Sequence, residues 1–349
     1  GSSGLSYIGL VSRSGGDGRA AFPEGWTAGG LDTSFFGGGG GAPVAVTTRA
    51  GGPEGTVALE AGQFGVISGE GPLVLDGELE VSAVASADGA VTGTIRNSTG
   101  LRLLEVALIN GRNGTNVGKL DPGQEAIFEI SSRRVDPFRP VEADVWPEQA
   151  GFDRPPTFDT IVNLALWTDA VRRAGPNFLM PGTVVAVGWT RSFQPGVEVS
   201  GPQAATGRSA IVSRTTITVS DGSLPAQAVR RELLRGPQGI RLDDGDVNGI
   251  PVQGTLFRFT VPAGTVDQPL ELVIPEYLAR VEVWDGTAWQ SVDDHITDLQ
   301  PNQFPDPMQT RAVAFPGSLL HEGTVFVRGT IRADMGGFDG TGFDLRGVQ

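Results

Sequence analysis

The sequence predicts a mainly β, multidomain protein, and three observations support this class: its length, its many turn residues and its alternating side chains. The chain has 349 residues, including 52 glycines and 24 prolines spread along its whole length. Frequent glycine and proline are typical of short strands joined by tight turns. Because domains commonly contain roughly 100–200 residues, we expect several folded units.

Changes in composition divide the chain into four segments. Residues 1–70 combine strand-like runs with the glycine stretch 37–41, which we interpret as a solvated loop. We expect a β-sandwich at residues 71–132, a small α+β segment at 133–250 and a C-terminal jelly-roll-like β-sandwich at 251–349.

The segment 71–132 shows the clearest strand pattern. Residues 79–85 alternate between apolar and polar side chains, the period of two that a half-buried strand requires. Asp88-Gly89 is a hairpin signal, because glycine adopts positive φ without strain. Further strands are expected at 91–97, 103–109 and 126–130, with a turn at 121–123. Several short strands in so few residues predict a small sandwich.

Two patterns in this segment resemble immunoglobulin-like modules of bacterial membrane-anchored envelope proteins. The strand end Gly93-Thr94-Ile95-Arg96-Asn97 fits a G-x-V/I-x-N pattern, and Leu120-Asp121-Pro122-Gly123 fits an L-x-P-G turn. The resemblance spans residues 72–132. It implies an immunoglobulin-like sandwich in an ectodomain of unknown or adhesive function, and it implies no active site.

The segment 133–250 begins with a proline-rich stretch and then changes character. The pattern of apolar residues predicts one main helix at about 157–174, which ends at Gly175-Pro176. Strands at 183–190 and 210–219 should follow, and then a short helix at about 224–234.

The segment 251–349 returns to strand patterns. Residues 256–261 alternate and stop at Pro262, and Asp285-Gly286-Thr287 predicts a hairpin turn between two tryptophans. The other strands are expected at 270–274, 281–284, 289–292, 324–331 and 342–348.

The charge of the chain limits the class of partner. The net charge is −14, and no cluster of basic residues interrupts the acidic composition. A nucleic-acid-binding protein needs a basic surface to displace counterions from phosphates. We therefore expect no nucleic-acid partner and no membrane contact by this chain itself, and acidity also disfavours polyanions in general.

Composition also indicates a compartment. Cysteine is absent, and Lys119 is the single lysine among many arginines, which is typical of a GC-rich bacterial genome. No apolar run reaches the ~20 residues that a membrane helix needs. We expect an extracytoplasmic protein at the cell surface or in the periplasm, cut at Gly1-Ser2 from a parent that is tethered through another segment.

Motifs of catalysis are missing from the sequence, so we expect a protein that is not an enzyme. His295 and His321 are 26 residues apart without ligand-like spacing, and we interpret both as turn or surface residues. There is no phosphate loop, dinucleotide fingerprint or nucleophile elbow. No cofactor is expected, with calcium as the one candidate ion.

The calcium candidate is Asp244, Asp246 and Asn248. Counting from Asp244, the sequence spells D-x-D-x-N-G, the first half of a calcium loop in which alternate oxygens meet the ion. The twelfth position is Thr255, where such loops carry glutamate, and Pro251 interrupts the loop. The alternative is an acidic hairpin turn.

Trp284 and Trp289 are the ligand candidates. They flank the predicted turn at 285–287 and could stack on sugar rings. The alternative is that both belong to the core, and a spacing of five residues favours it because it places them on opposite sides of the hairpin. Two functions follow: a non-catalytic ectodomain acting as a structural, adhesive or protein-interaction module, with envelope proteins or glycans as partners, or a carbohydrate-binding or carbohydrate-active protein that uses the C-terminal sandwich.

Overall fold

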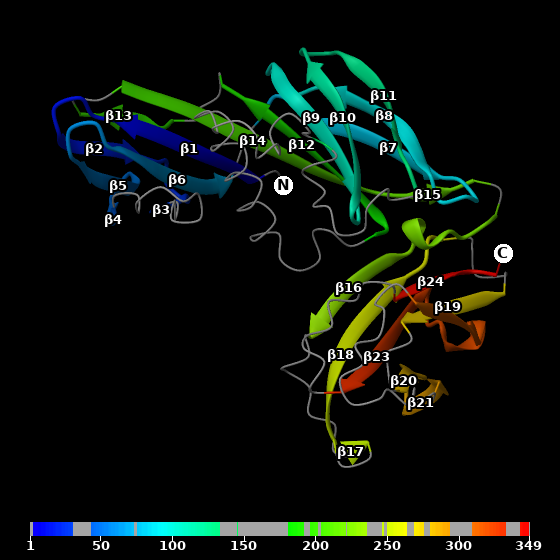
Figure 1. The fold of residues 1–349 in the computed structure, drawn as a ribbon. Coiled ribbons are helices and arrows are strands. Elements are labelled where there is room, and N and C mark those ends of the chain that lie inside the picture. Colours follow the sequence, from blue (N-terminus) through cyan, green and yellow to red (C-terminus); the bar gives the residue numbers. More distant parts are fainter. Residues whose placement is uncertain are drawn as a thin grey trace.

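The fold is mainly β, as predicted. The computed structural model describes residues 3–30, 43–72, 75–132, 145, 181–191, 196–201, 204–220, 222–235, 246–247, 250–263, 269–275, 280–293, 309–332 and 343–348. Their regular structure is almost entirely strand, arranged in several antiparallel sheets (Figure 1). Within these ranges, no helix is long and apolar enough to cross a membrane. The helix predicted at 157–174 lies outside the described residues.

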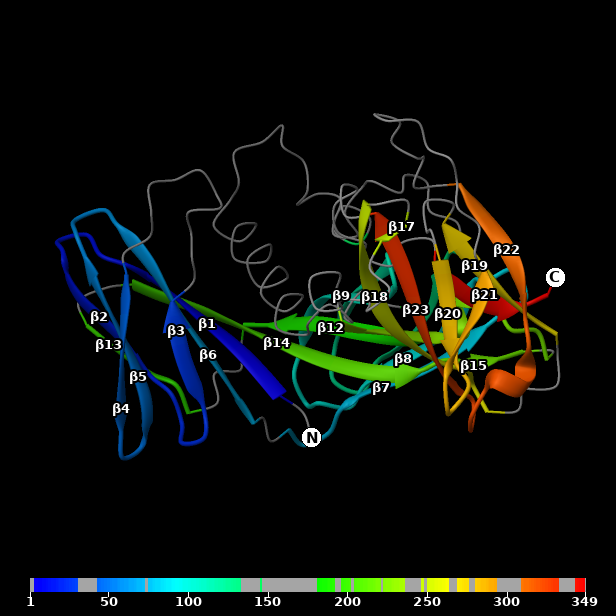
Figure 2. The same ribbon diagram turned by 90° about the horizontal axis from the view of Figure 1, so that it is seen from below.

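One seven-stranded sheet connects the first two units of the chain. Its order is β10 (Asn113–Leu120), β9 (Leu103–Asn110), β12 (Thr183–Thr190), β14 (Ala204–Thr216), β1 (Ser3–Val11), β6 (Phe64–Pro72) and β3 (Thr27–Gly30). Strand β14 pairs with β1 from Ala204 to Ile211 and with β12 from Ser209 to Thr216. A single strand therefore belongs to both units, and Figure 2 shows it running from the N-terminal strands towards the middle of the molecule.

The N-terminal unit is completed by a second sheet of β13 (Glu198–Ser200), β2 (Gly16–Ala21), β5 (Gly52–Leu59) and β4 (Val44–Arg49). The rings of Phe22 and Trp26 stack in its core, with centroids 6.0 Å apart. They lie against glycines of β6: a Cβ on Gly69 would come within 2.1 Å of Phe22, and one on Gly71 within 2.3 Å of Trp26. Glycine is required at both positions because the rings occupy the space of any side chain.

The second unit places β11 (Glu125–Ile130), β8 (Val91–Asn97), β7 (Leu79–Ala85) and β15 (Thr218–Val219) in a sheet with its own buried face. Asn97 links the two sequence patterns of this unit, the G-x-V/I-x-N strand end and the L-x-P-G turn. Its side-chain Nδ2 donates to the backbone carbonyl oxygens of Leu101 and Leu120, at 2.7 and 3.0 Å, and its backbone carbonyl oxygen accepts from Gly123 N at 2.7 Å. The strand end and the L-x-P-G turn are therefore one hydrogen-bonded corner, buried at Asn97.

The C-terminal unit is a second sandwich, of two facing sheets. One contains β16 (Arg230–Arg235), β18 (Ile250–Thr260), β23 (Thr324–Arg332), β20 (Arg280–Trp284) and β21 (Trp289–Asp293), with β17 (Asp246–Val247) paired to β18; the other contains β22 (Thr310–Phe315), β19 (Leu270–Pro275) and β24 (Asp344–Gly347). Phe343 packs edge-on against Phe257 and Phe259, at centroid distances of 5.3 and 5.6 Å. Aromatic packing thus joins the sheets in the middle of the sandwich.

A short connection couples the second and third units. Leu224 and Val229 are buried within one continuous core that extends from β7 to β24. The carbonyl of Gln227 accepts from Asn110 Nδ2 and Gly182 N, while Gly347 N donates to the Leu224 carbonyl at 2.8 Å. The connection is therefore fixed to both sides by backbone hydrogen bonds and apolar contacts.

The predicted helix at 224–234 is wrong. Ala226–Ala228 forms one 3-10 turn, and Arg230–Arg235 forms β16, which pairs with β18. Helix propensity is a weak preference that pairing with a neighbouring strand readily overrides. The strand predicted at 183–190 is confirmed as β12.

The sheets cross the segment borders drawn from composition. Strands β12, β13 and β14, from the segment 133–250, complete sheets begun by residues 1–132, and β16 belongs to the C-terminal sandwich. These pairings join positions far apart in the chain, which a local composition pattern does not reveal.

Leu224→Ala should destabilise the protein by about 2–5 kcal/mol, the usual cost of a cavity at a buried leucine. Leu224 is 3% exposed and contributes to the core that two units share, so we expect both units to lose stability together. Chemical denaturation followed by circular dichroism would measure the change. Leu234→Ala is the matched control because Leu234 is 41% exposed, and an equal loss in both variants would contradict the shared core.

Candidate functional site

The outer face of the β16-β18-β23-β20-β21 sheet carries a cluster of aromatic and charged side chains. Alternate residues of its three central strands point into the sandwich and are buried: Phe257, Phe259, Val325, Val327, Val281 and Val283. Since successive side chains of a strand point to opposite faces, the intervening residues lie on the other face. They include Arg258, Phe326, Arg328, Glu282 and Trp284.

Three aromatic residues form a row across this face, which we call the aromatic row: Phe326, Trp284 and Trp289. Trp284 and Trp289 are direct partners in the β20–β21 pairing, with ring centroids 5.4 Å apart and ring planes at 59°. Val283 pairs with Val327, so the next position of the same register places Trp284 beside Phe326. All three side chains are half-buried, so the row is neither core nor fully solvated.

A buried carboxylate lies beside the aromatic row. Glu282 is 3% exposed, and its Oε2 accepts from Arg328 Nε at 2.5 Å, while Arg280 Nη2 lies 3.4 Å from Oε1. The guanidinium of Arg328 also lies over the Trp289 ring, 4.6 Å from its centroid. Arg328 thus compensates a buried charge and supports an indole ring at once.

A second group of ion pairs continues the face towards β16. Glu232 contacts Arg230 Nη2 at 2.6 Å and Arg258 at 2.5 Å, and its side chain is only 11% exposed. Arg258 pairs with Phe326 in the sheet register. The aromatic row therefore has an arginine at the Phe326 side and another over Trp289.

Asp285 shapes the turn between the two tryptophans. Its Oδ1 accepts hydrogen bonds from the backbone N–H groups of Thr287 and Ala288, at 2.7 and 2.8 Å, and Oδ2 accepts from Gln290 Nε2 at 2.7 Å. These donors hold the pKa of the Asp285 carboxyl well below its ordinary value. The carbonyl oxygen of Asp285 meets His321 Nε2 at 2.9 Å, so this histidine is a turn contact.

The structure brings together the two ligand candidates predicted from sequence. Trp284 and Trp289 occupy the two strands of one hairpin, and their rings face the same side of the sheet and touch. The alternative that both belong to the core does not describe them, because each is half-buried.

Two of the three residues of the calcium candidate, Asp244 and Asn248, lie outside the described residues. His295, which is not part of that candidate, also lies outside them. Asp246 begins β17 and pairs with Pro251 of β18. Among the residues that the structure does describe, no group of three or more histidine, aspartate or glutamate side chains could hold a metal ion. The calcium site stays a prediction.

Sequence reasoning missed the arginines, Glu282 and Phe326. The sequence did predict the strands that carry these residues: the alternating pattern at 256–261 for Arg258, and the strand expected at 324–331 for Phe326 and Arg328. What these patterns lack is the register between strands about 70 residues apart, because register arises from long-range pairing.

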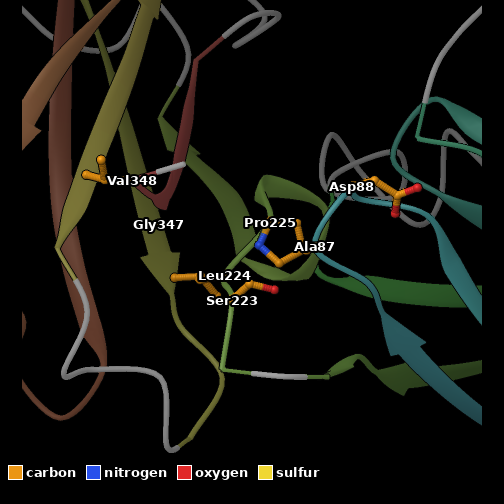
Figure 3. Close-up of a pocket in the computed structure, with 7 residues that line it drawn as sticks. All are labelled: Ala87, Asp88, Ser223, Leu224, Pro225, Gly347 and Val348. Carbon is orange, nitrogen blue, oxygen red and sulfur yellow. The ribbon is translucent and has the colours of Figure 1, made fainter.

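A cavity of about 410 Å³ lies at the coupling of the second and third units (Figure 3). It is lined by Ala87, Asp88, Ser223, Leu224, Pro225, Gly347 and Val348. Asp88 accepts hydrogen bonds from Ser86 Oγ at 2.5 Å and Ala90 N at 3.2 Å, which lower its pKa. Its carboxylate therefore closes its own turn, and the cavity offers mainly apolar walls.

Comparison with known proteins finds one family. The model of a family described as a domain of unknown function (DUF8725) matches residues 78–219. This range begins at β7 and ends with β15, so it covers the second unit together with β12 and β14. No curated protein matches the chain. The aromatic row lies outside the matched range.

Asp285→Ala should separate the tryptophan rings, because three hydrogen bonds to Oδ1 hold the turn between them. We expect the exciton signal of the indole pair in circular dichroism to decrease markedly. Asp285→Asn is the matched control, since its amide oxygen retains the Oδ1 acceptor. An unchanged signal in Asp285→Ala would show that the sheet alone positions the rings.

The exciton signal of the indole pair should stay intact at pH values well below 3.8, the ordinary pKa of an aspartate side chain. A carboxyl whose pKa is depressed in the folded state contributes stability above its unfolded pKa, and this is lost only as pH falls through the folded pKa. The exciton signal of the folded protein measures this directly. A loss centred near pH 3.8 in the wild type, and absent from Asp285→Asn, would contradict the depressed pKa.

Proposed function

We propose that this chain is a non-catalytic, extracytoplasmic binding module that holds a glycan against the aromatic row. The observation that carries the proposal is the direct pairing of Trp284 and Trp289 as half-buried, touching rings on the outer face of the C-terminal sheet. Indole rings combine a large apolar face with a polar N–H group, which suits a ligand with both apolar and hydroxylated surfaces. Sugar rings have this character.

The surroundings of the row support a ligand rather than a purely apolar contact. Ser291 lies two residues from Trp289, pairs with Glu282 of the same face and is exposed, while Arg328 lies against the Trp289 ring. Binding sites for small ligands typically combine apolar walls with a few convergent polar groups that fix orientation.

The scaffold favours a pre-formed site. Strand β20 is hydrogen-bonded on one side to β21 and on the other to β23, and its Val281 and Val283 are fully buried. Side chains on a rigid strand lose little entropy when a ligand binds, and this increases affinity.

The extracytoplasmic location belongs to the same proposal. It is supported by the resemblance of residues 72–132 to immunoglobulin-like envelope modules and by the absence of cysteine. In that setting the chain would display its C-terminal sheet from a tethered parent, with an envelope glycan as the partner.

A structural or adhesive module is the second candidate. The observation that favours it is the continuity of the scaffold. The first and second units share β14, and the second and third units share one core. A chain coupled in this way could transmit load between envelope proteins. Binding of a purified envelope protein, without any glycan, would favour this candidate.

Trp289→Ala should weaken glycan binding at least tenfold, in line with the cost of removing a tryptophan that makes a main contact of a binding surface. The measurement is a titration of the full chain with neutral and acidic oligosaccharides, together with a thermal melt, because a ligand of the folded state raises the melting temperature.

Ile127→Ala is the control for this titration, since Ile127 is 82% exposed on another sheet. It should bind as the wild type does. Binding that survives in both Trp289→Ala and Trp284→Ala would refute the aromatic row as the site.

A further inference from the structure

We propose that the glycan bound at the aromatic row carries an anionic group, a carboxylate or a sulfate, that Arg328 and Arg258 recognise. This inference rests on the proposed function, since it assigns the ligand class of the same site. It follows from the hydrogen-bonding state of the two guanidinium groups, the depth of their carboxylate partners and the charge of this face.

Arg328 has unused hydrogen-bonding capacity beside the row. Its Nε donates to Glu282, and its guanidinium plane lies over Trp289. Within the described part of the chain, neither of its Nη atoms donates a hydrogen bond to the protein. Its side chain is 21% exposed. A guanidinium in this state can present two parallel N–H groups to a carboxylate or sulfate, the geometry that such anions favour.

Arg258 provides a second cationic group at the Phe326 side of the row. Its Nε and Nη2 both contact Oε2 of Glu232, and its side chain is 39% exposed. The outer Nη1 edge has no hydrogen bond to any described residue. Arg258 therefore lies beside Phe326 on the neighbouring strand β18, and Arg328 lies two residues from Phe326 along β23.

The carboxylates of this face are deeper than the guanidinium groups. The side chains of Glu282 and Glu232 are 4% and 11% exposed. Those of Arg230, Arg258 and Arg280 are 48%, 39% and 40% exposed. Long arginine side chains commonly cover buried groups while their charged ends stay in water. A ligand therefore meets cations first.

The ion-paired groups of this face have a net positive charge. Four arginines, namely Arg230, Arg258, Arg280 and Arg328, contact two glutamates. The whole chain has a net charge of −14, which disfavours polyanions at long range. At physiological ionic strength, however, charges more than about 8 Å away are largely screened. The local excess of arginine therefore decides the interaction at contact distance.

The size of the row indicates an oligosaccharide. From Arg258 on β18 to Trp289 on β21 the row crosses three spacings between neighbouring strands. At about 4.8 Å each, this is roughly 14 Å, long enough for several sugar rings. A chain of acidic sugars could place rings on the aromatic side chains and acidic groups on both arginines.

The test compares an oligogalacturonate with its methyl-esterified form, and dextran sulfate with dextran, by titration of the full chain. We expect each anionic ligand to bind at least tenfold more tightly than its neutral counterpart, and more weakly as salt is raised. The first pair identifies a carboxylate ligand and the second a sulfate. Arg328→Lys keeps the charge beside Glu282 but removes the planar fork, so it should weaken anionic binding about tenfold, the effect of a lost charge-assisted hydrogen bond.

Arg346→Lys is the matched control, because Arg346 pairs with Glu271 at 2.6 Å on the other sheet of the same sandwich. It should leave binding unchanged, and equal melting temperatures would show that both variants fold. Equal binding of charged and neutral forms would overturn the anionic ligand and leave the proposed function standing. Failure of every glycan to bind would overturn both.

Discussion

The pairing of β14 with two partners is the constraint on which the rest of the structure depends. Along its first part β14 is hydrogen-bonded to β1, and along its last part to β12, so the N-terminal and second units share one sheet. Each unit then covers its part of that sheet with a separate four-stranded sheet. The ladder of backbone hydrogen bonds is therefore continuous across the border between the two units.

The next coupling is apolar and begins where β15 ends. Leu224, Ala228 and Val229 extend the core of the second unit into the C-terminal sandwich, and the backbone of Gln227 is hydrogen-bonded from two directions. Gly182 is needed for this approach, because a Cβ there would come within 2.1 Å of Arg230 Cα, and its φ is +90°. A close backbone contact and a buried leucine thus act together in orienting the C-terminal sheets.

The outer face of the C-terminal sheet shows how a buried charge shapes a surface. Glu282 is 3% exposed, and Arg328 and Arg280 lie against its carboxyl group, the kind of partner that a buried acidic side chain requires. The hydrogen bond to Glu282 also positions Arg328 over Trp289, and this contact stabilises the edge of the aromatic row. The proposed site therefore depends on ion pairs whose first role is structural, which is why its charged residues are not recognisable as a motif.

Local sequence determined the strands and turns of this protein, while the tertiary structure decided their partners. Period-two alternation located β7 and β18, and Asp285-Gly286-Thr287 located the turn between Trp284 and Trp289. Side-chain direction and turn geometry are properties of a few neighbouring residues. Three features depend instead on contacts between distant positions. They are the sharing of β14 by two units, the strand at Arg230–Arg235 where helix propensity predicted a helix, and the register that places Phe326 and Arg328 beside the tryptophans. Those contacts follow from the packing of whole sheets, and no short segment encodes them.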